Sequence, residues 1–263
     1  MSTVGHYWRG IGWRCAAPLV VALGCLVAHR AGYRVEAHLV FFGLVCLMLW
    51  GTLAPRSPLF GQVVTHLPGE AGVLITLDDG PDPQTTPALL DILDQHQAKA
   101  LFFLIGAKAA RHPELVAEIL RRGHSVANHS MNHPSGSFWC LSPWRMWREL
   151  RECEAVFFPH LPHALRWFRP PIGHHNLFCH AAAQALGLRM MLWDCRGYDA
   201  VDRDVPRVLQ RLGESLRPGS IMLLHDAVPT SSAVLEGALV LIAQRGLQTA
   251  PVPPAQAFSA TIR

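Results

Sequence analysis

Net positive charge is missing from most of this 263-residue chain. Of its 23 basic and 19 acidic residues, residues 1–58 hold five arginines and one acid, Glu36, so residues 59–263 contain equal numbers of each sign. A nucleic-acid-binding domain concentrates lysine and arginine, because phosphate contacts dominate its affinity. The even balance predicts no nucleic-acid partner.

Paired cysteine spacings are also missing. The seven cysteines fall in or beside two apolar runs or are scattered through the rest of the chain, at Cys15, Cys25, Cys46, Cys140, Cys153, Cys179 and Cys195. None forms a CxxC zinc pattern or a disulfide framework, which suits a reducing compartment.

Charged residues are absent from two long runs near the N-terminus. Ala37–Ala54 is 18 residues long and Cys15–Ala28 is 14, and a membrane-spanning helix needs about 20 apolar residues. The shorter run reaches that length with Trp13 and Ile11 if Arg14 extends its charged end to the membrane interface. A signal peptide is less favoured, because no small-residue cleavage site precedes a soluble start and a second apolar run follows. We expect a two-span hairpin, with one span plus an interfacial segment as the alternative.

The hairpin divides the chain into a membrane anchor, residues 1–58, and a body, residues 59–263, joined by a Pro- and Gly-rich linker, Leu53–Pro68. A hairpin leaves the N-terminus and the body on the same side of the membrane. That side carries three arginines, against two in the loop between the spans. The positive-inside rule and the unpaired cysteines both favour a body that faces the cytoplasm.

In the body, short apolar runs alternate with helical patterns, and no internal repeat occurs. Helix starts are indicated where proline follows a capping residue, at Thr86–Pro87, His112–Pro113 and Ser142–Pro143. The predicted strands are Val73–Leu77, Leu101–Ile105, Ser125–Ala127, Leu165–Phe168, Met190–Trp193, Ile221–Leu224 and Leu247–Ala250. Such alternation predicts an α/β fold with a parallel sheet and helices outside it, open or closed into a barrel. A Pro- and Ala-rich tail follows Pro251.

Polar side chains follow five of the predicted strands. In parallel strand–helix folds the functional residues gather where strands end. The residues at these positions are Asp78, Asp79, His129, His133, Arg169, Asp199 and His225. The sequence therefore places them together on one rim of the sheet.

The adjacent carboxylates of Asp78 and Asp79 repel each other, and a bound cation would compensate for their repulsion. His129 and His133 are four residues apart, which on one helical turn puts both imidazoles on one face. With one carboxylate they provide two nitrogens and one oxygen, a set that leaves metal positions open for water and substrate.

The motifs LITLDDGP, HSMNH, RPPIG, WDCRGYDA and LLHD, in this order and spacing, resemble those of the NodB-type polysaccharide deacetylases, carbohydrate esterase family four. The resemblance covers about Val73 to Ala250. It implies a distorted parallel (β/α)7 barrel with a divalent metal, usually Zn2+, held by Asp79, His129 and His133.

The resemblance also implies catalytic roles for the remaining rim residues. Asp78 would be the base, Arg169 would orient it and His225 would be the general acid, with Asp199 bracing His225 or Arg169. As a hypothesis, the metal polarises an acetamido carbonyl and Asp78 takes a proton from the attacking water. A backbone N–H within Pro171–Gly173 stabilises the oxyanion, and His225 protonates the departing amine.

Four positions depart from the family pattern. Ile172 stands where an aromatic residue is common, Arg196 where an acid is common, Ala200 where tryptophan is common, and Met222 where leucine is frequent. None belongs to the implied metal set, so we expect an active enzyme and not a pseudoenzyme.

The expected activity is metal-dependent removal of N-acetyl groups from an amino sugar. Relatives of this kind act on chitin oligomers, peptidoglycan, acetylated xylan or a lipid-linked formamido sugar, so a deformylase or an O-acetyl esterase is the alternative within the family. The hairpin favours a lipid-linked or membrane-proximal glycan at the bacterial inner membrane, because tethering raises the local concentration of substrate.

Two alternatives belong to other classes: a non-haem iron oxygenase, which shares the two-histidine, one-carboxylate set, and a non-catalytic membrane-bound sugar-binding protein. Trp139, Trp144 and Trp147 are candidates for a sugar subsite, for the membrane interface or for the core.

Overall fold

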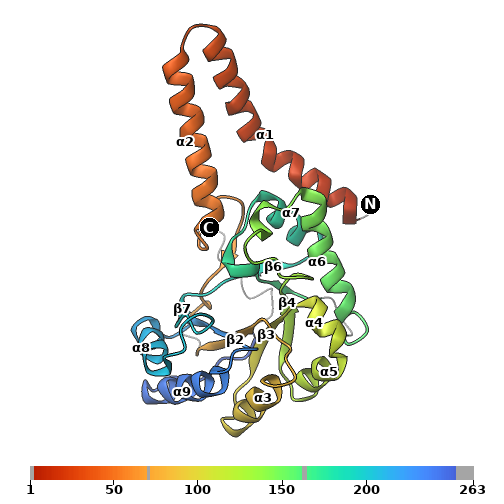
Figure 1. The fold of residues 1–263 in the computed structure, drawn as a ribbon, viewed down its shortest axis with the longest axis vertical. Coiled ribbons are helices and arrows are strands. Elements are labelled where there is room, and N and C mark those ends of the chain that lie inside the picture. The colour runs from red at the N-terminus through yellow and green to blue at the C-terminus, as the bar shows by residue number, and fades with distance from the viewer. Residues whose placement is uncertain (1–2, 70–71, 162–164, 253–263) are drawn as a thin grey trace.

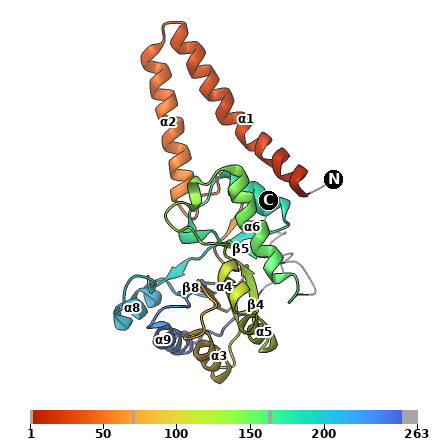
Figure 2. The same ribbon diagram turned by 45° about the vertical axis from the view of Figure 1, so that its right-hand side comes forward.

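A helical hairpin stands on an α/β body in the computed structural model, which describes residues 3–69, 72–161 and 165–252 (Figures 1 and 2). The hairpin consists of α1 (Thr3–Arg30) and α2 (Arg34–Leu53). The tail after Pro251 lies, except for Val252, outside the described residues.

The body is built on one eight-stranded sheet, in the order β1-β6-β5-β4-β3-β2-β8-β7, in which every pairing is parallel. The strands are β1 (Val63–Val64), β2 (Leu74–Asp78), β3 (Ala100–Leu104), β4 (Ser125–Asn128), β5 (Trp167–Phe168), β6 (Arg189–Met191), β7 (Cys195–Arg196) and β8 (Ile221–His225). The edge strands β1 and β7 do not pair with each other, so the sheet is an open, curled half-barrel.

This sheet confirms the predicted α/β class and corrects the prediction of seven strands. Leu247–Ala250 is not a strand, because Thr249 makes only an isolated bridge to Val73. Two strands of two residues each, β1 and β7, were not predicted, and β1 lies inside the segment predicted as a linker. Two residues are too few to show an alternating pattern.

Seven α-helices and two short 3-10 helices follow the hairpin in the described residues. They are α3 (Thr86–Gln95), α4 (Gly106–Arg111), α5 (Pro113–Arg121), η1 (Phe138–Cys140), α6 (Pro143–Phe157), η2 (Pro171–Gly173), α7 (Leu177–Ala185), α8 (Val205–Ser215) and α9 (Ser231–Gln244). The three proline-marked helix starts are confirmed. The cap predicted at Thr86 is wrong, since its hydroxyl donates to Asp226 instead of capping α3.

Side chains of the central strands alternate between two apolar clusters, as the period of a strand requires. Ile75 and Leu77 of β2 belong to the cluster shared with the surrounding helices. Leu74 of β2 and Phe103 of β3 belong to the cluster inside the half-barrel. Asp78 lies four residues after Leu74 on the same face of β2, so its carboxylate faces the inside of the half-barrel.

The beginning of α1 packs on the body instead of standing free. Tyr7 is fully buried, donates its hydroxyl to the Pro143 carbonyl and stacks on Trp147 with ring centroids 5.0 Å apart. Arg14 donates to the Phe60 carbonyl at 3.2 Å and to Gln184 at 3.0 Å. The charged end of Arg14 is therefore bound to the body.

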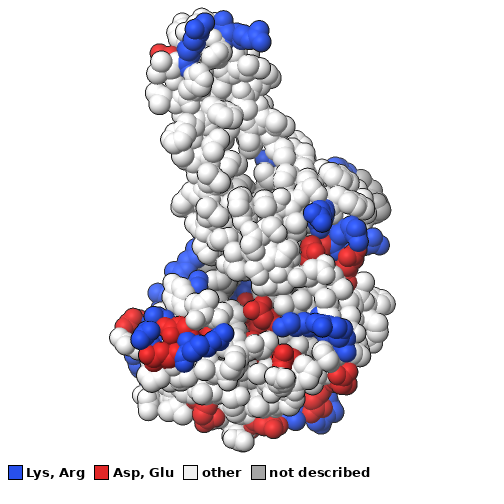
Figure 3. Space-filling view, in the orientation of Figure 1, with Lys and Arg blue, Asp and Glu red and all other residues white. Residues whose placement is uncertain are grey.

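Beyond Arg14, the hairpin shaft is apolar and exposed. Both helices are long and apolar enough to cross a membrane, a property that signal sequences share. Residues 15–29 of α1 and 37–53 of α2 contain no Lys, Arg, Asp or Glu, so beyond Arg14 the charges of the hairpin lie at its tip, at Arg30, Arg34 and Glu36. Figure 3 shows this group of charges at the tip, above a shaft that is mostly uncharged.

Candidate active site

The register of the sheet places the predicted site residues at the same end of neighbouring strands. Asp78 of β2 pairs with His225 of β8, and Asn128 of β4 pairs with Phe168 of β5. His129 and Arg169 therefore follow side by side at the next position.

All seven predicted site residues meet at this rim. Asp78, Asp79, His129, His133 and His225 line one cavity of about 270 Å³. Arg169 and Asp199 lie behind its wall and contact Asp78 and His225.

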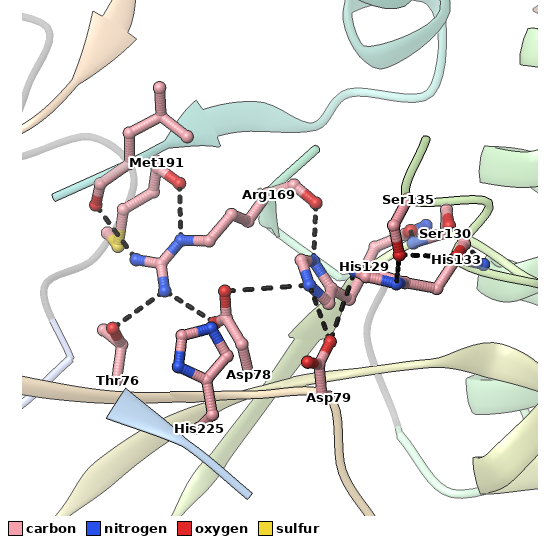
Figure 4. A network of polar contacts seen from close by, with 12 residues as sticks. Thr76, Asp78, Asp79, His129, Ser130, His133, Ser135, Arg169, Met191 and His225 are labelled. Atoms are coloured by element: carbon pink, nitrogen blue, oxygen red, sulfur yellow. Dashed lines mark hydrogen bonds and ion pairs between the residues drawn. The ribbon is translucent and has the colours of Figure 1, made fainter. Parts of the chain in front are cut away.

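Asp79, His129 and His133 form a compact group of metal-ligand atoms (Figure 4). Asp79 Oδ1 lies 3.4 Å from His129 Nε2 and 3.2 Å from His133 Nε2, and one donor atom from each residue lies within 4.8 Å of the others. Two ligands about 2.0–2.1 Å from one tetrahedral zinc ion are about 3.3 Å apart. The observed spacings fit one such ion.

The two histidines meet through a loop and not through the predicted helical turn. Their ring centroids are 4.6 Å apart, but Ser130 and His133 have φ angles of 65° and 49°. Asn128 Oδ1 accepts the Ser130 N–H at 2.9 Å, and Ser130 Oγ accepts the His133 N–H at 3.1 Å. A positive φ angle costs free energy at a residue other than glycine, and residues with such angles cluster at functional sites.

Hydrogen bonds engage Nδ1 of both imidazoles, which leaves Nε2 of each ring facing Asp79 as a candidate metal ligand. His129 Nδ1 lies 2.8 Å from the Arg169 carbonyl, which can only accept, so Nδ1 carries the proton and Nε2 has the lone pair. His133 Nδ1 lies 3.0 Å from Ser135 Oγ. Burial is the largest cause that lowers the pKa of His133 to about 4, so this ring is neutral near pH 7.

Asp79 is the anionic member of the group. Burial raises the pKa of its carboxyl, but His129, His133 and His225 lower it by more and hold it well below its usual range. Its Oδ1 is nevertheless buried without a hydrogen-bond partner among the described residues. A cation between this oxygen and the two ring nitrogens would satisfy all three, so the residues fit a metal.

Asp78 is held from behind by Arg169, which is fully buried. Arg169 Nη1 donates to Asp78 Oδ1 at 2.7 Å and to Thr76 Oγ1 at 2.8 Å. Its Nε and Nη2 donate to the carbonyls of Met191 and Leu192. This arrangement fixes one oxygen of Asp78 and leaves Oδ2 at the cavity, 3.6 Å from His129 Nε2.

His225 faces the same cavity. Of the two residues that Asp199 was expected to brace, His225 and Arg169, it is His225 that Asp199 contacts. Asp199 Oδ1 lies 2.9 Å from His225 Nδ1, and Oδ2 accepts the His225 backbone N–H at 2.7 Å. Burial lowers the pKa of His225, but the hydrogen bond and charge of Asp199, with the charges of Asp78 and Asp79, raise it by more. The net direction is upward, which favours an imidazolium with its second N–H free for a ligand.

Three supporting residues were not predicted. Thr76 shares Arg169 with Asp78, Ser135 supports His133, and Lys108 Nζ donates to the Asp79 carbonyl at 2.7 Å. Thr76 alone had a signal in the sequence, as a hydroxyl in the middle of an apolar strand. Ser135 and Lys108 had none, because a loop brings Ser135 to the site and the packing of α4 brings Lys108.

The three candidate tryptophans do not line the cavity. Trp147 is fully buried and Trp144 is 49 % exposed. The aromatic residues of the cavity wall are Trp193 and Tyr198.

The comparisons with known proteins agree with this geometry. The sequence model of the polysaccharide deacetylase family matches residues 67–191. A chitooligosaccharide deacetylase from a Bradyrhizobium species is 36 % identical over 61 % of this chain and 73 % of its own length. A peptidoglycan-N-acetylglucosamine deacetylase from Bacillus cereus is 34 % identical over 63 % of this chain and 78 % of its own.

A solved structure of a family 4 carbohydrate esterase from Streptomyces lividans, in complex with acetate, superposes with a TM-score of 0.64 and 28 % identity, covering 70 % of this chain and 98 % of that one. The parallel half-barrel is not the antiparallel jelly roll expected for the oxygenase alternative. Fold and site thus define a carbohydrate deacetylase, an enzyme that hydrolyses a carbon–nitrogen amide bond. The chain belongs to the polysaccharide deacetylase family.

Proposed function

We propose that this chain is a Zn2+-dependent deacetylase that removes the N-acetyl group from an amino sugar held close to a membrane. One observation carries the proposal: of two adjacent carboxylates, Asp79 joins two imidazole nitrogens while Asp78 is held apart by Arg169, opposite His225. This separation gives the two acids different tasks.

Asp79, His129 and His133 would hold the metal. Two imidazole nitrogens and one carboxylate oxygen suit zinc. A bound zinc ion would polarise the amide carbonyl and bring the pKa of a coordinated water to about 7. The orphaned Oδ1 of Asp79 supports this assignment.

Asp78 and His225 would move the protons. Asp78 Oδ2 takes a proton from the attacking water, while Arg169 keeps Oδ1 and the carboxylate plane fixed. His225, charged through Asp199, donates a proton to the departing nitrogen. This completes hydrolysis to acetate and a free amine.

The backbone N–H of Ile172 would stabilise the oxyanion. Within Pro171–Gly173, Pro171 has no N–H and that of Gly173 donates to the Pro170 carbonyl at 2.9 Å. Ile172 lines the cavity with a φ of 51°. It therefore offers the only uncommitted candidate of the predicted segment.

The membrane-proximal substrate is supported by contacts between the foot of the hairpin and residues that follow Ile172 and Trp193 of the cavity wall. The Thr52 carbonyl accepts the His175 N–H at 3.2 Å, and Arg56 donates to the Asp194 carbonyl at 3.2 Å. Gly173, whose φ is 81°, has no Cβ, and an added Cβ would lie 3.3 Å from Pro55. We propose that residues 1–58 anchor the catalytic domain, residues 59–263, with its cavity close to the bilayer and the domain facing the cytoplasm.

The test is acetate release from N-acetylated sugars by the purified full chain. We expect activity that chelation abolishes and Zn2+ restores, with no requirement for oxygen. Asp78→Asn should lower kcat by roughly 10²–10⁴-fold, the range for loss of a general base, with unchanged zinc content measured by elemental analysis. Near-normal turnover in Asp78→Asn would refute the base assignment, and no acetate from any acetylated sugar would refute the proposed activity.

A further inference from the structure

Arg196, unlike Arg169, lines the cavity itself, and it takes no part in the chemistry described above. Arg196 ends β7, where its Cα pairs with that of Leu223, two residues before His225. Arg196 and Leu223 both line the cavity. The guanidinium carbon lies 3.8 Å from the ring centroid of Tyr198 and 5.3 Å from that of Trp193. Its cation is therefore held against the aromatic wall of the cavity.

The two arginines of the site differ in their partners. The guanidinium nitrogens of Arg169 donate to a carboxylate, a hydroxyl and two carbonyls. The Arg196 side chain makes no hydrogen bond or ion pair with any residue that the structure describes, and its Nε is buried without an acceptor. A guanidinium keeps its charge in proteins, and a buried donor without a partner costs free energy.

The carboxylates around the cavity are already engaged. Asp78 pairs with Arg169, Asp199 pairs with His225, and Asp79 belongs to the candidate metal group. Stacking on Tyr198 orients the guanidinium but supplies no oxygen acceptor. An oxygen acceptor carried by the substrate would satisfy this buried donor.

We propose that Arg196 binds an anionic oxygen group, a phosphate ester or a carboxylate, that the sugar substrate carries near its reacting amide. The planar fork of a guanidinium binds both groups through paired hydrogen bonds. The inference rests on the deacetylase activity proposed above and narrows its substrate to an anionic amino sugar. A phosphate ester also suits the foot of the hairpin, because a sugar attached to a lipid through phosphate presents that group beside the bilayer.

The experiment compares three N-acetylated sugars on the zinc-loaded full chain: N-acetylglucosamine 1-phosphate, N-acetylmuramic acid as the carboxylate, and neutral methyl N-acetylglucosaminide. Arg196→Gln removes the charge, and Arg196→Lys keeps it without the planar fork. Arg207→Gln is the matched control, since this arginine is exposed on α8 and pairs with Asp202 and Asp204 outside the cavity. Acetate release gives kcat/KM, and calorimetry gives the affinity for each sugar.

We expect the wild type to prefer one anionic sugar over the neutral one by roughly tenfold to a hundredfold, the range for charge-assisted hydrogen bonds. Arg196→Gln should lose this preference while its kcat/KM on the neutral sugar stays within about twofold of the wild type. Arg196→Lys should keep part of the preference and Arg207→Gln all of it. Which anion is preferred identifies the group as phosphate or carboxylate.

The inference is overturned if the wild type does not distinguish the sugars, or if both Arg196 variants keep its full preference. Acetate release from all three sugars at equal rates would leave the deacetylase proposal standing and remove only the role of Arg196. If no sugar releases acetate, the deacetylase proposal fails, and the calorimetric affinities decide about Arg196 separately. In that case, equal affinities of the wild type and Arg196→Gln for each anionic sugar would refute the proposed role of Arg196.

Discussion

Replacing Asp199 with Asn should change how the activity depends on pH. Asp199 accepts two hydrogen bonds from His225, one from Nδ1–H and one from the backbone N–H. An Asn side chain has the same shape but one acceptor oxygen and no charge, so one of these donors would face an NH2 group. The variant therefore disfavours the imidazolium form of His225.

The structure sets both the direction and the size of the effect. Asp199 raises the pKa of His225, and the general acid works only while it is protonated, so wild-type activity falls as the pH rises through this raised pKa. Without the charge, the fall begins at lower pH. A hydrogen bond to a charged group contributes about 1.5–3 kcal/mol, so kcat/KM in the alkaline range should drop by roughly tenfold to a hundredfold.

The assay is the pH profile of kcat/KM for acetate release by wild type and Asp199→Asn. The two profiles should converge toward acid pH, where His225 is protonated in both enzymes. Asp202→Asn is the control, because this carboxylate lies in the same loop but pairs with Arg211 and Arg207. An alkaline limb at the same pH in Asp199→Asn and wild type would refute the assignment of His225 as the acid.

Three further predictions concern the metal group, the buried ion pair and the orientation of the domain. His133→Ala should lose bound zinc and acetate release together, whereas His112→Ala, a histidine on the surface that pairs with Glu114, should keep both; zinc retained at full stoichiometry in His133→Ala would contradict the ligand set. Arg169→Met should lower the free energy of unfolding by about 3–5 kcal/mol, because it leaves Asp78 buried without its partner; a thermal unfolding midpoint equal to that of the wild type would show that the pair is not coupled. A variant with Cys140, which is exposed on the body, as its only cysteine should react with a membrane-impermeant maleimide only after the inner membrane is opened; labelling in intact spheroplasts would place the domain on the other side.

Local signals in the sequence were sufficient for the class of fold and for which polar residues meet at one rim of the sheet. Predicted strands of three to five residues coincide with most of the central strands β2, β3, β4 and β8. Because parallel strands end at one edge of a sheet, polar residues after Leu77, Ala127 and Leu224 had to meet there, whatever the details of the connecting loops.

The tertiary structure decided what depends on neighbours far away in the chain. Strands β1 and β7 have two residues each and exist because longer strands beside them offer hydrogen bonds. The histidine loop follows from the turn at Asn128 and not from a four-residue helical spacing. In the same way, the pairing of Asp199 with His225 was one of two open alternatives until the fold brought the two together.

Two features of function were invisible in the sequence for the same reason. The docking of Tyr7 and Arg14 on the body joins the hairpin to the domain across more than 100 residues of chain. Arg196 is one arginine among many until the fold places it in the cavity without an acceptor. Composition and spacing report the types of groups that a chain carries, whereas the partners of each group are fixed only when the packed core sets their distances.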